Sequence, residues 1–207
     1  VDVANNSEIK KAASEVLTTF GSIDFLINNA GIIIGRYFHE HTEEDILNTM
    51  NVNANAPILI THAFIGEMIA RNSGHICNVA SSGGLLSNPK MSVYVASKWS
   101  LIGYSDSLRL EMERLKRNIK VTTIMPYYIN TGMFDGVKSK IPILDPEATA
   151  VTILNAIEKN KKMVSIPGYI YRVTRFAQAV LPLSIFDWFT GTVLGIYKTM
   201  DNFKGRI

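Results

Sequence analysis

Tyr94 and Lys98 lie four residues apart in the segment SSGGLLSNPKMSVYVASK, which begins at Ser81. Residues at this spacing share one face of a helix, so a phenol and an ammonium group can interact there. A phenol has a reference pKa of about 10, and lowering it to about 7 requires about 4 kcal/mol of preference for the phenolate. One cation at about 4 Å supplies this amount at an effective dielectric constant of about 20. The pair therefore predicts proton transfer to or from an alcohol or ketone, with no metal ion required.

A tyrosine–lysine pair alone is a weak signal, since about half a match of this kind is expected by chance in a chain of this composition. The order of the motifs carries more weight. The turn LINNAG ends at Gly31, and Asn53 follows it. Ser81 then ends an apolar strand, and the Tyr94–Lys98 pair opens the next helix. This ordered set resembles the short-chain dehydrogenase/reductase family, and the resemblance covers nearly all of the chain.

The resemblance implies a role for each of these polar residues. Tyr94 would be the general acid/base, and Lys98 would hold the nicotinamide ribose and lower the pKa of Tyr94. Ser81 would bind the substrate oxygen, and Asn53 would support a proton relay. Ser81 is preferred to Ser82, the alternative, because the family places its serine thirteen residues before its tyrosine. The alternative is that these residues have no catalytic role. They would then be a helical tyrosine, a lysine that reaches solvent and a serine-rich turn.

The resemblance also implies contacts with a bound NAD or NADP. Asp2 would contact adenine, and Thr131, in the segment PYYINTGMF, would bind the nicotinamide carboxamide. Tyr127 stands where the family usually has glycine. The full set of expected cofactor contacts is Asp2, Val3, Asn28, Ala30, Gly31, Tyr94, Lys98, Ile129 and Thr131.

The Gly-rich phosphate loop of the family, T-G-x-x-x-G-x-G, has no match in the sequence. The opening residues VDV resemble the third strand of the family sheet, which would then lack its neighbour. We therefore interpret the sequence as a fragment, a truncated isoform or a product that lacks its N-terminal segment. The residues that choose between NAD and NADP usually follow the second strand of the family sheet, so the choice stays open.

Helical and strand patterns alternate along the chain, which predicts a parallel sheet with helices on both faces, a doubly wound Rossmann-type α/β fold. Cap and stop signals, including the capping box of Thr42 and Asp45, set the boundaries of the helices. Helices are predicted for residues 7–20, 42–71 with a break at Pro57, 94–117 and 145–160, and strands for 25–27, 76–80, 120–125 and 163–166.

Composition favours one globular domain, because 47% of the residues are hydrophobic, 19% are charged and the net charge is only +3. The single cysteine, Cys77, lies in an apolar strand, so an intramolecular disulfide is excluded and a reducing compartment is expected. The four histidines show no ligand spacing, and no metal site or nucleic-acid motif is predicted. We expect residues 1–166 to form a partial dinucleotide-binding and catalytic domain, and residues 167–207 to form an extension.

That extension is apolar and basic. The run from Ala177 to Tyr197 carries one charge, Asp187, and is interrupted by Pro182 and two glycines. It is too broken for a membrane span, so we predict a helical interfacial segment or a substrate lid. Its flanking basic residues suit an anionic membrane surface, although a solvated rim around a lid would also explain them.

The stretch PYYINTGMF resembles the branch that holds epidermal retinol dehydrogenases, enzymes of the retinol dehydrogenase 10 type and 17β-hydroxysteroid dehydrogenases of lipid droplets. This resemblance implies a homodimeric enzyme that oxidises lipophilic alcohols at the endoplasmic reticulum membrane or the lipid droplet surface, with its catalytic domain on the cytosolic side. The alternative is a non-catalytic truncated form, which acts as a dimerisation or lipid-surface binding module.

Overall fold

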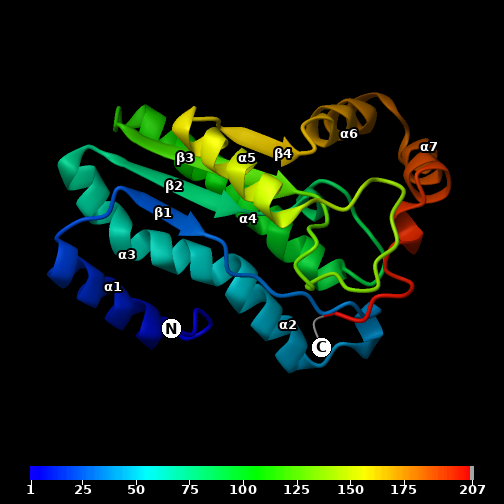
Figure 1. The fold of residues 1–207 in the computed structure, drawn as a ribbon, viewed down its shortest axis with the longest axis horizontal. Coiled ribbons are helices and arrows are strands. Elements are labelled where there is room, and N and C mark those ends of the chain that lie inside the picture. The colour runs from blue at the N-terminus through cyan, green and yellow to red at the C-terminus, as the bar shows by residue number, and fades with distance from the viewer. Residues whose placement is uncertain (206–207) are drawn as a thin grey trace.

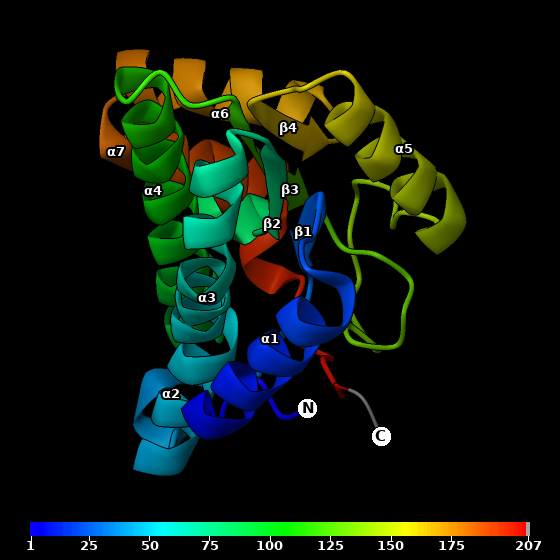
Figure 2. The same cartoon turned by 90° about the vertical axis from the view of Figure 1, so that its left-hand side faces the viewer.

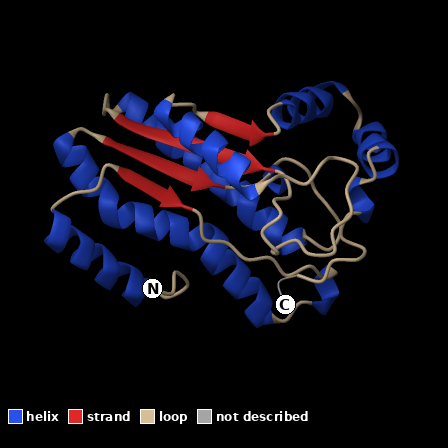
Figure 3. Cartoon of the chain, viewed as in Figure 1, coloured by secondary structure: helices blue, strands red, loops and turns tan. Residues whose placement is uncertain are grey.

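The computed structural model describes residues 1–205, which form a four-stranded parallel sheet with helices on both faces (Figure 3). The strands stand in the order β1-β2-β3-β4, which is also their order along the chain. Their bounds are Phe25–Asn28 for β1, Gly74–Val79 for β2, Ile119–Pro126 for β3 and Met163–Ile166 for β4. All three pairings are parallel, and the predicted α/β fold is confirmed.

Within residues 1–205, seven α-helices precede, connect or follow these strands (Figure 1). They are α1 (Asn6–Phe20), α2 (Glu43–Met50), α3 (Ala56–Arg71), α4 (Ser92–Arg114), α5 (Pro146–Glu158), α6 (Tyr169–Val180) and α7 (Leu183–Trp188). The predicted capping box opens α2, because the Thr42 side chain accepts a hydrogen bond from the Asp45 N–H and the Asp45 carboxylate accepts one from the Thr42 N–H.

The two faces of the sheet have separate cores, because successive strand residues point to opposite sides. On one face, Ile76 of β2 packs with Met68 of α3 and Leu108 of α4. On the other, its neighbour Cys77 packs with Ile157 of α5. Figure 2 shows this arrangement, with α3 and α4 on one side of the strands and α5 on the other. Cys77 is a free, buried thiol, as predicted, and burial raises its pKa to about 12.

Two predictions about the N-terminal half are wrong in detail. The segment predicted as one helix with a break at Pro57 is interrupted by a π-helical turn, Asn51–Asn55, just before Pro57, which lies in the first turn of α3. The predicted strand at Val1–Val3 does not form. The Asp2 carboxylate instead accepts a hydrogen bond from the Ala4 N–H, 2.9 Å away, in a turn ahead of α1. A strand requires a neighbouring ladder, and this segment has none among the described residues.

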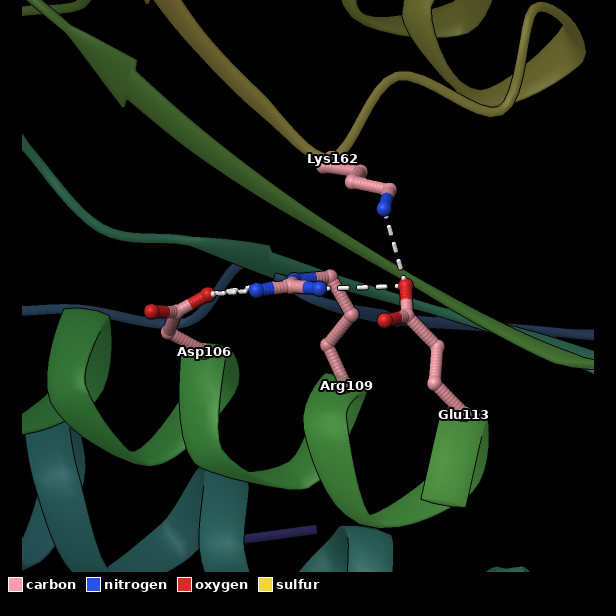
Figure 4. A network of polar contacts seen from close by, with 4 residues as sticks. All are labelled: Asp106, Arg109, Glu113 and Lys162. Carbon is pink, nitrogen blue, oxygen red and sulfur yellow. Dashed lines mark hydrogen bonds and ion pairs between the residues drawn. The ribbon is translucent and has the colours of Figure 1, made fainter. Parts of the chain in front are cut away.

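A charged network fixes α4 against the start of β4 (Figure 4). The Arg109 guanidinium contacts the Asp106 carboxylate at 2.6 Å and the Glu113 carboxylate at 3.0 Å, and Lys162 reaches Glu113 from the segment before β4 at 2.9 Å. Lys162 and Arg109 hold the pKa of Glu113 below its ordinary value. Exposed pairs of this kind contribute at most about 1 kcal/mol each, so they orient α4 more than they stabilise it.

The tail, defined here as residues 167–205, contains α6 and α7 and then returns toward the carboxyl ends of the strands (Figure 1). Met200 is almost fully buried there and joins the core cluster of Tyr94 and Tyr128. Within residues 1–205, no helix combines the length and the apolar character needed to cross a membrane.

Candidate active site

A cavity of about 250 Å³ opens at the carboxyl ends of β1, β2 and β3. We call it the central cavity. Asn29 follows β1, Val79 ends β2 and Pro126 ends β3, and all three line it. In open parallel sheets this edge is where ligands bind, because the loops that leave the strands converge there.

Tyr94 and Lys98 project into this cavity from the first turns of α4, as their spacing predicts. Both side chains are buried, with 5% and 4% of their surface exposed. The Lys98 Nζ lies 5.8 Å from the centre of the Tyr94 ring and donates a hydrogen bond to the Val79 carbonyl at 3.0 Å. An ammonium group has three N–H donors, so Lys98 keeps donors for a ligand.

Ser81 also lines the cavity, immediately after β2, and faces Tyr94 across Gly83. The Ser81 Oγ accepts a hydrogen bond from the Gly83 N–H at 3.0 Å. A Cβ atom on Gly83 would lie 3.3 Å from the Ser81 Oγ and 3.4 Å from a carbon of the Tyr94 ring. The absence of a side chain at Gly83 therefore lets the serine and the tyrosine border the same space. Ser82 lines the cavity as well.

Asn53 lies in the π-helical turn between α2 and α3 and is fully buried. Its side-chain amide donates hydrogen bonds to the Ile32 carbonyl at 2.8 Å and to the Ser97 Oγ at 3.1 Å, and its Oδ1 accepts one from the Ile32 N–H at 2.8 Å. These bonds position the loop after β1 beside α4. The expected relay function stays a prediction, since both atoms of the amide are engaged with the protein.

Burial controls the protonation of Tyr94 and Lys98. It raises the pKa of Tyr94 to about 12; Ser81 acts in the opposite direction and lowers it, while Tyr128 adds to the increase. Burial also lowers the pKa of Lys98 to about 8. The direction for Tyr94 is opposite to the one expected from the lysine, because burial removes the phenolate from water. At neutral pH the tyrosine is therefore a phenol and a proton donor.

Some of the expected cofactor residues line the cavity and others do not. Those that line the cavity are Gly31, Tyr94, Lys98, Ile129 and Thr131. Asn28 lies behind it, where its side chain bonds Asn78 and Thr61, and Ala30 is exposed beside it. Asp2 and Val3 lie outside the cavity, in the turn ahead of α1, and their expected contacts with the cofactor stay a prediction.

Several residues of the cavity could not be found from the motifs. The Asn88 amide donates hydrogen bonds to the Tyr128 hydroxyl at 3.2 Å and to the Thr199 Oγ1 at 2.8 Å. The Phe134 ring stands edge-on between the rings of Tyr94 and Tyr128. Ile196, in the tail, closes the same space. Of these residues, only Ile196 lies in a segment, the tail, that the sequence analysis offered as a substrate lid.

The cavity fits the nicotinamide and ribose part of a dinucleotide. A Cβ atom on Gly31 would lie 3.4 Å from the Asn53 Oδ1 and 3.5 Å from the Lys98 Nζ, so the absence of a side chain leaves space for a ligand beside these groups. The remaining Lys98 donors suit ribose hydroxyls, and Thr131 offers a hydroxyl for an amide. Among residues 1–205, no cluster of histidine, cysteine or acidic side chains is arranged to hold a metal ion.

The parallel sheet, the helices on both faces and the cavity at the strand ends define an α/β protein of the Rossmann type. A family model described as short chain dehydrogenase matches residues 1–142, which is more than half of the sequence. The chain belongs to this family, as its motifs predicted.

Similar proteins agree with this assignment. The chain is 33% identical to epidermal retinol dehydrogenase 2 of Mus musculus, over 99% of this chain and 67% of that protein. It is 38% identical to retinol dehydrogenase 10-B of Danio rerio, over 87% of this chain and 56% of that protein. It is 34% identical to 17-beta-hydroxysteroid dehydrogenase 13 of Rattus norvegicus, over 82% of this chain and 57% of that protein. The chain thus spans between 56% and 67% of the length of these relatives.

Solved structures share the fold. A short-chain dehydrogenase from Streptomyces avermitilis is 25% identical with a TM-score of 0.75, over 93% of this chain and 78% of that chain. A 4-hydroxyisoleucine dehydrogenase complexed with NADH is 25% identical with a TM-score of 0.70, over 80% of this chain and 77% of that chain. A Burkholderia phymatum short chain dehydrogenase/reductase in complex with NAD has a TM-score of 0.76 at 21% identity, over 86% and 73%, and supports the fold alone.

Proposed function

We propose that this protein is an NAD(P)-dependent oxidoreductase that transfers a hydride between the cofactor and a lipophilic alcohol or ketone. The observation that carries the proposal is the meeting of Tyr94, Lys98 and Ser81 in one buried cavity. A proton donor, a cation and a second hydroxyl next to a reacting oxygen are what carbonyl reduction and alcohol oxidation need.

The nicotinamide, when bound, supplies or accepts the hydride. Tyr94 donates its phenolic proton to the carbonyl oxygen during reduction. During oxidation its phenolate form takes the proton from the alcohol. Ser81 donates a hydrogen bond to the same oxygen, which fixes its position. Lys98 stabilises the phenolate that Tyr94 becomes, and its remaining N–H groups bind ribose hydroxyls. Asn53 acts by holding the Ile32 backbone, and the preceding residue, Gly31, lies beside Lys98.

The walls of the cavity support a lipophilic substrate of the retinol or steroid class. Leu86, Met91, Phe134 and Ile196 present apolar surface around the reacting hydroxyls. Apolar walls with a few convergent polar groups are typical of sites for apolar small molecules. The names of the relatives, which include retinol and 17-beta-hydroxysteroid dehydrogenases, support the same class.

Two measurements test this function. Titration with NADH and NADPH, followed by cofactor fluorescence, is expected to give binding and to show which nucleotide is preferred. With a retinoid or hydroxysteroid alcohol, Tyr94→Phe is expected to abolish turnover without weakening cofactor binding. Tyr104→Phe, on the same helix but outside the cavity, is the matched control. Turnover by Tyr94→Phe would refute the assignment, and binding of neither nucleotide would favour the non-catalytic alternative.

We also propose that the protein works as a homodimer at the endoplasmic reticulum membrane or a lipid droplet, with residues 1–166 as its catalytic part and the tail as a substrate lid or membrane-facing extension. The buried, free Cys77 supports a reducing compartment on the cytosolic side. Light scattering tests the dimer, and cell fractionation tests the location.

A further inference from the structure

Helix α6 presents apolar side chains on two of its faces. Ile170 and Thr174 are buried on one face, toward the rest of the chain. A second face carries large apolar side chains at intervals of four, three and four residues, which places them on one side of the helix. All are exposed: Tyr169, Val173, Phe176 and Val180. A stripe of this kind marks a surface that a partner covers.

The exposed apolar surface continues along the chain beyond α6. Figure 1 shows α7 directly after α6, at the end of the molecule toward which β4 points. Further exposed apolar residues follow there: Leu183, Ile185, Trp188, Phe189 and Val193. We call these residues, together with the α6 stripe, the docking face. Aromatic and aliphatic side chains exposed on short helices suit insertion into the boundary between lipid headgroups and acyl chains.

A positively charged hollow of about 330 Å³ borders this face, between α5, β4 and α6. Lys159, Lys161 and Arg172 line it, together with polar residues that include Asn155 and Ser165. Its lining contains no carboxylate. Because Arg172 belongs to α6 itself, the hollow and the apolar stripe meet on one helix. Cations beside an apolar helix face complement a negatively charged lipid surface.

We propose that the docking face and this basic hollow bind the surface of a membrane that contains anionic phospholipids, with headgroup phosphates in the hollow. The positive charge of the hollow favours a membrane surface over a second copy of the chain as the occupant. A symmetric dimer through this face would bring the same patch of each copy together, and like charges facing one another across an interface cost several kcal/mol. An anionic lipid surface neutralises the same cations.

The docking face is connected to the central cavity. The Gln178 amide of α6 donates a hydrogen bond to the Leu85 carbonyl at 2.9 Å, and the next residue, Leu86, lines the cavity. Ile196, three residues beyond the last apolar residue of the face, lines it too. A lipophilic substrate dissolved in the membrane would thus have a short path to Tyr94. This last point rests on the proposed catalytic function, and the docking develops the membrane-facing role proposed for the tail.

Vesicle flotation tests the docking. The purified protein is mixed with vesicles of phosphatidylcholine alone, or of phosphatidylcholine and phosphatidylserine at about two to one. Binding is expected to be stronger to the anionic vesicles. The triple variant Lys159→Gln, Lys161→Gln, Arg172→Gln is expected to lose this preference, with about 100-fold weaker binding to anionic vesicles, because each cation near such a surface contributes about fivefold.

A second variant tests the apolar part. Phe176→Ser with Trp188→Ser, at side chains 69% and 60% exposed, is expected to weaken binding to both kinds of vesicle. The matched control is Phe20→Ser with Phe38→Ser, at side chains 73% and 65% exposed but far from the tail in sequence, and is expected to bind as the unmodified protein does. Because all four side chains are exposed, the folded state is retained, which circular dichroism checks.

Three results would overturn the proposal. The first is no binding of the unmodified protein to either vesicle. The second is equal binding by the Phe176→Ser, Trp188→Ser variant. The third is a smaller mass for that variant in light scattering, which would make the face a contact between two copies. Failure of the proposed function can be told apart from failure of the docking. Tyr94→Phe is expected to lose turnover but keep vesicle binding. The docking variants are expected to lose vesicle binding but keep activity on a water-soluble alcohol.

Discussion

Replacing Lys98 with methionine is predicted to stabilise the protein at neutral pH while lowering its activity. Burial lowers the pKa of Lys98 from its ordinary value of 10.5 to about 8. Each pKa unit corresponds to about 1.4 kcal/mol, so holding the charged lysine in this site costs the folded state about 3 kcal/mol. Methionine is close to lysine in length and needs no hydration. It leaves the Val79 carbonyl without its side-chain donor, which costs about 1 kcal/mol.

The net gain in the free energy of unfolding is about 2 kcal/mol at pH 7, and for a chain of this size it corresponds to a rise in Tm of about 4 to 8 °C. The gain depends on pH in a defined direction. Below pH 8 the lysine is protonated in both the folded and unfolded states, so the full cost is present. Between about pH 8 and 10.5 only the unfolded state keeps the proton, so the unmodified protein gains stability as the pH rises.

The assay is thermal unfolding of both proteins at a series of pH values from neutral to alkaline, with Lys11→Met, an exposed lysine of α1, as the control. The difference between Lys98→Met and the unmodified protein is expected to be largest near pH 7, to fall to zero as the pH rises toward 10.5 and then to reverse by about 1 kcal/mol, because the hydrogen bond to Val79 is still lost. The control is expected to change the free energy of unfolding by about 0.5 kcal/mol or less. A Lys98→Met protein less stable than the original at pH 7 would refute the reasoning.

Three further predictions concern the groups around this site. Asn53→Ala removes three buried hydrogen bonds and is expected to lower the free energy of unfolding by about 2 to 4 kcal/mol in denaturant titrations; an unchanged midpoint would contradict its positioning role. In alcohol oxidation, Lys98→Met is expected to lower turnover by about 100-fold at pH 7, where the lysine is protonated, since a cation about 6 Å from the Tyr94 ring favours phenolate by about 3 kcal/mol, and to lower it much less above pH 8, where the lysine loses its charge; an unchanged rate at pH 7 would exclude this effect. Gly136→Ala is expected to displace the tail and speed its proteolysis, because the new Cβ would collide with tail backbone, whereas Gly132→Ala has the same positive φ but open space around it; equal effects of the two would contradict the tail contact.

Much of the fold follows from local patterns in the sequence. The predicted strand at 163–166 matches β4, and the predicted helix 7–20 matches α1 to within one residue. The Asn5 side chain caps α1 as its residue type predicts, by accepting hydrogen bonds from the Ser7 and Glu8 N–H groups. These elements are predictable because hydrophobic period and capping chemistry act over a few residues.

The core of the site was also accessible to sequence reasoning, but its electrostatics were not. Spacing alone places Tyr94 and Lys98 on one face of α4. The depth of burial, which raises one pKa and lowers the other, depends on atoms contributed by other elements. The family motif likewise identified Asn53, whereas the π-helical turn that directs its amide to Ile32 forms only through the packed tertiary structure.

The sequence by itself determined the family, the order of the elements and the pair of side chains that can move a proton, because these depend on residue type and short spacing. Only the tertiary structure decided that Val1–Val3 is not a strand and that the tail returns to close the cavity. The contact between Asn88 and Thr199 joins residues 111 positions apart. No local pattern specifies such a pair, since it exists only when the packing of the whole chain brings the two residues together.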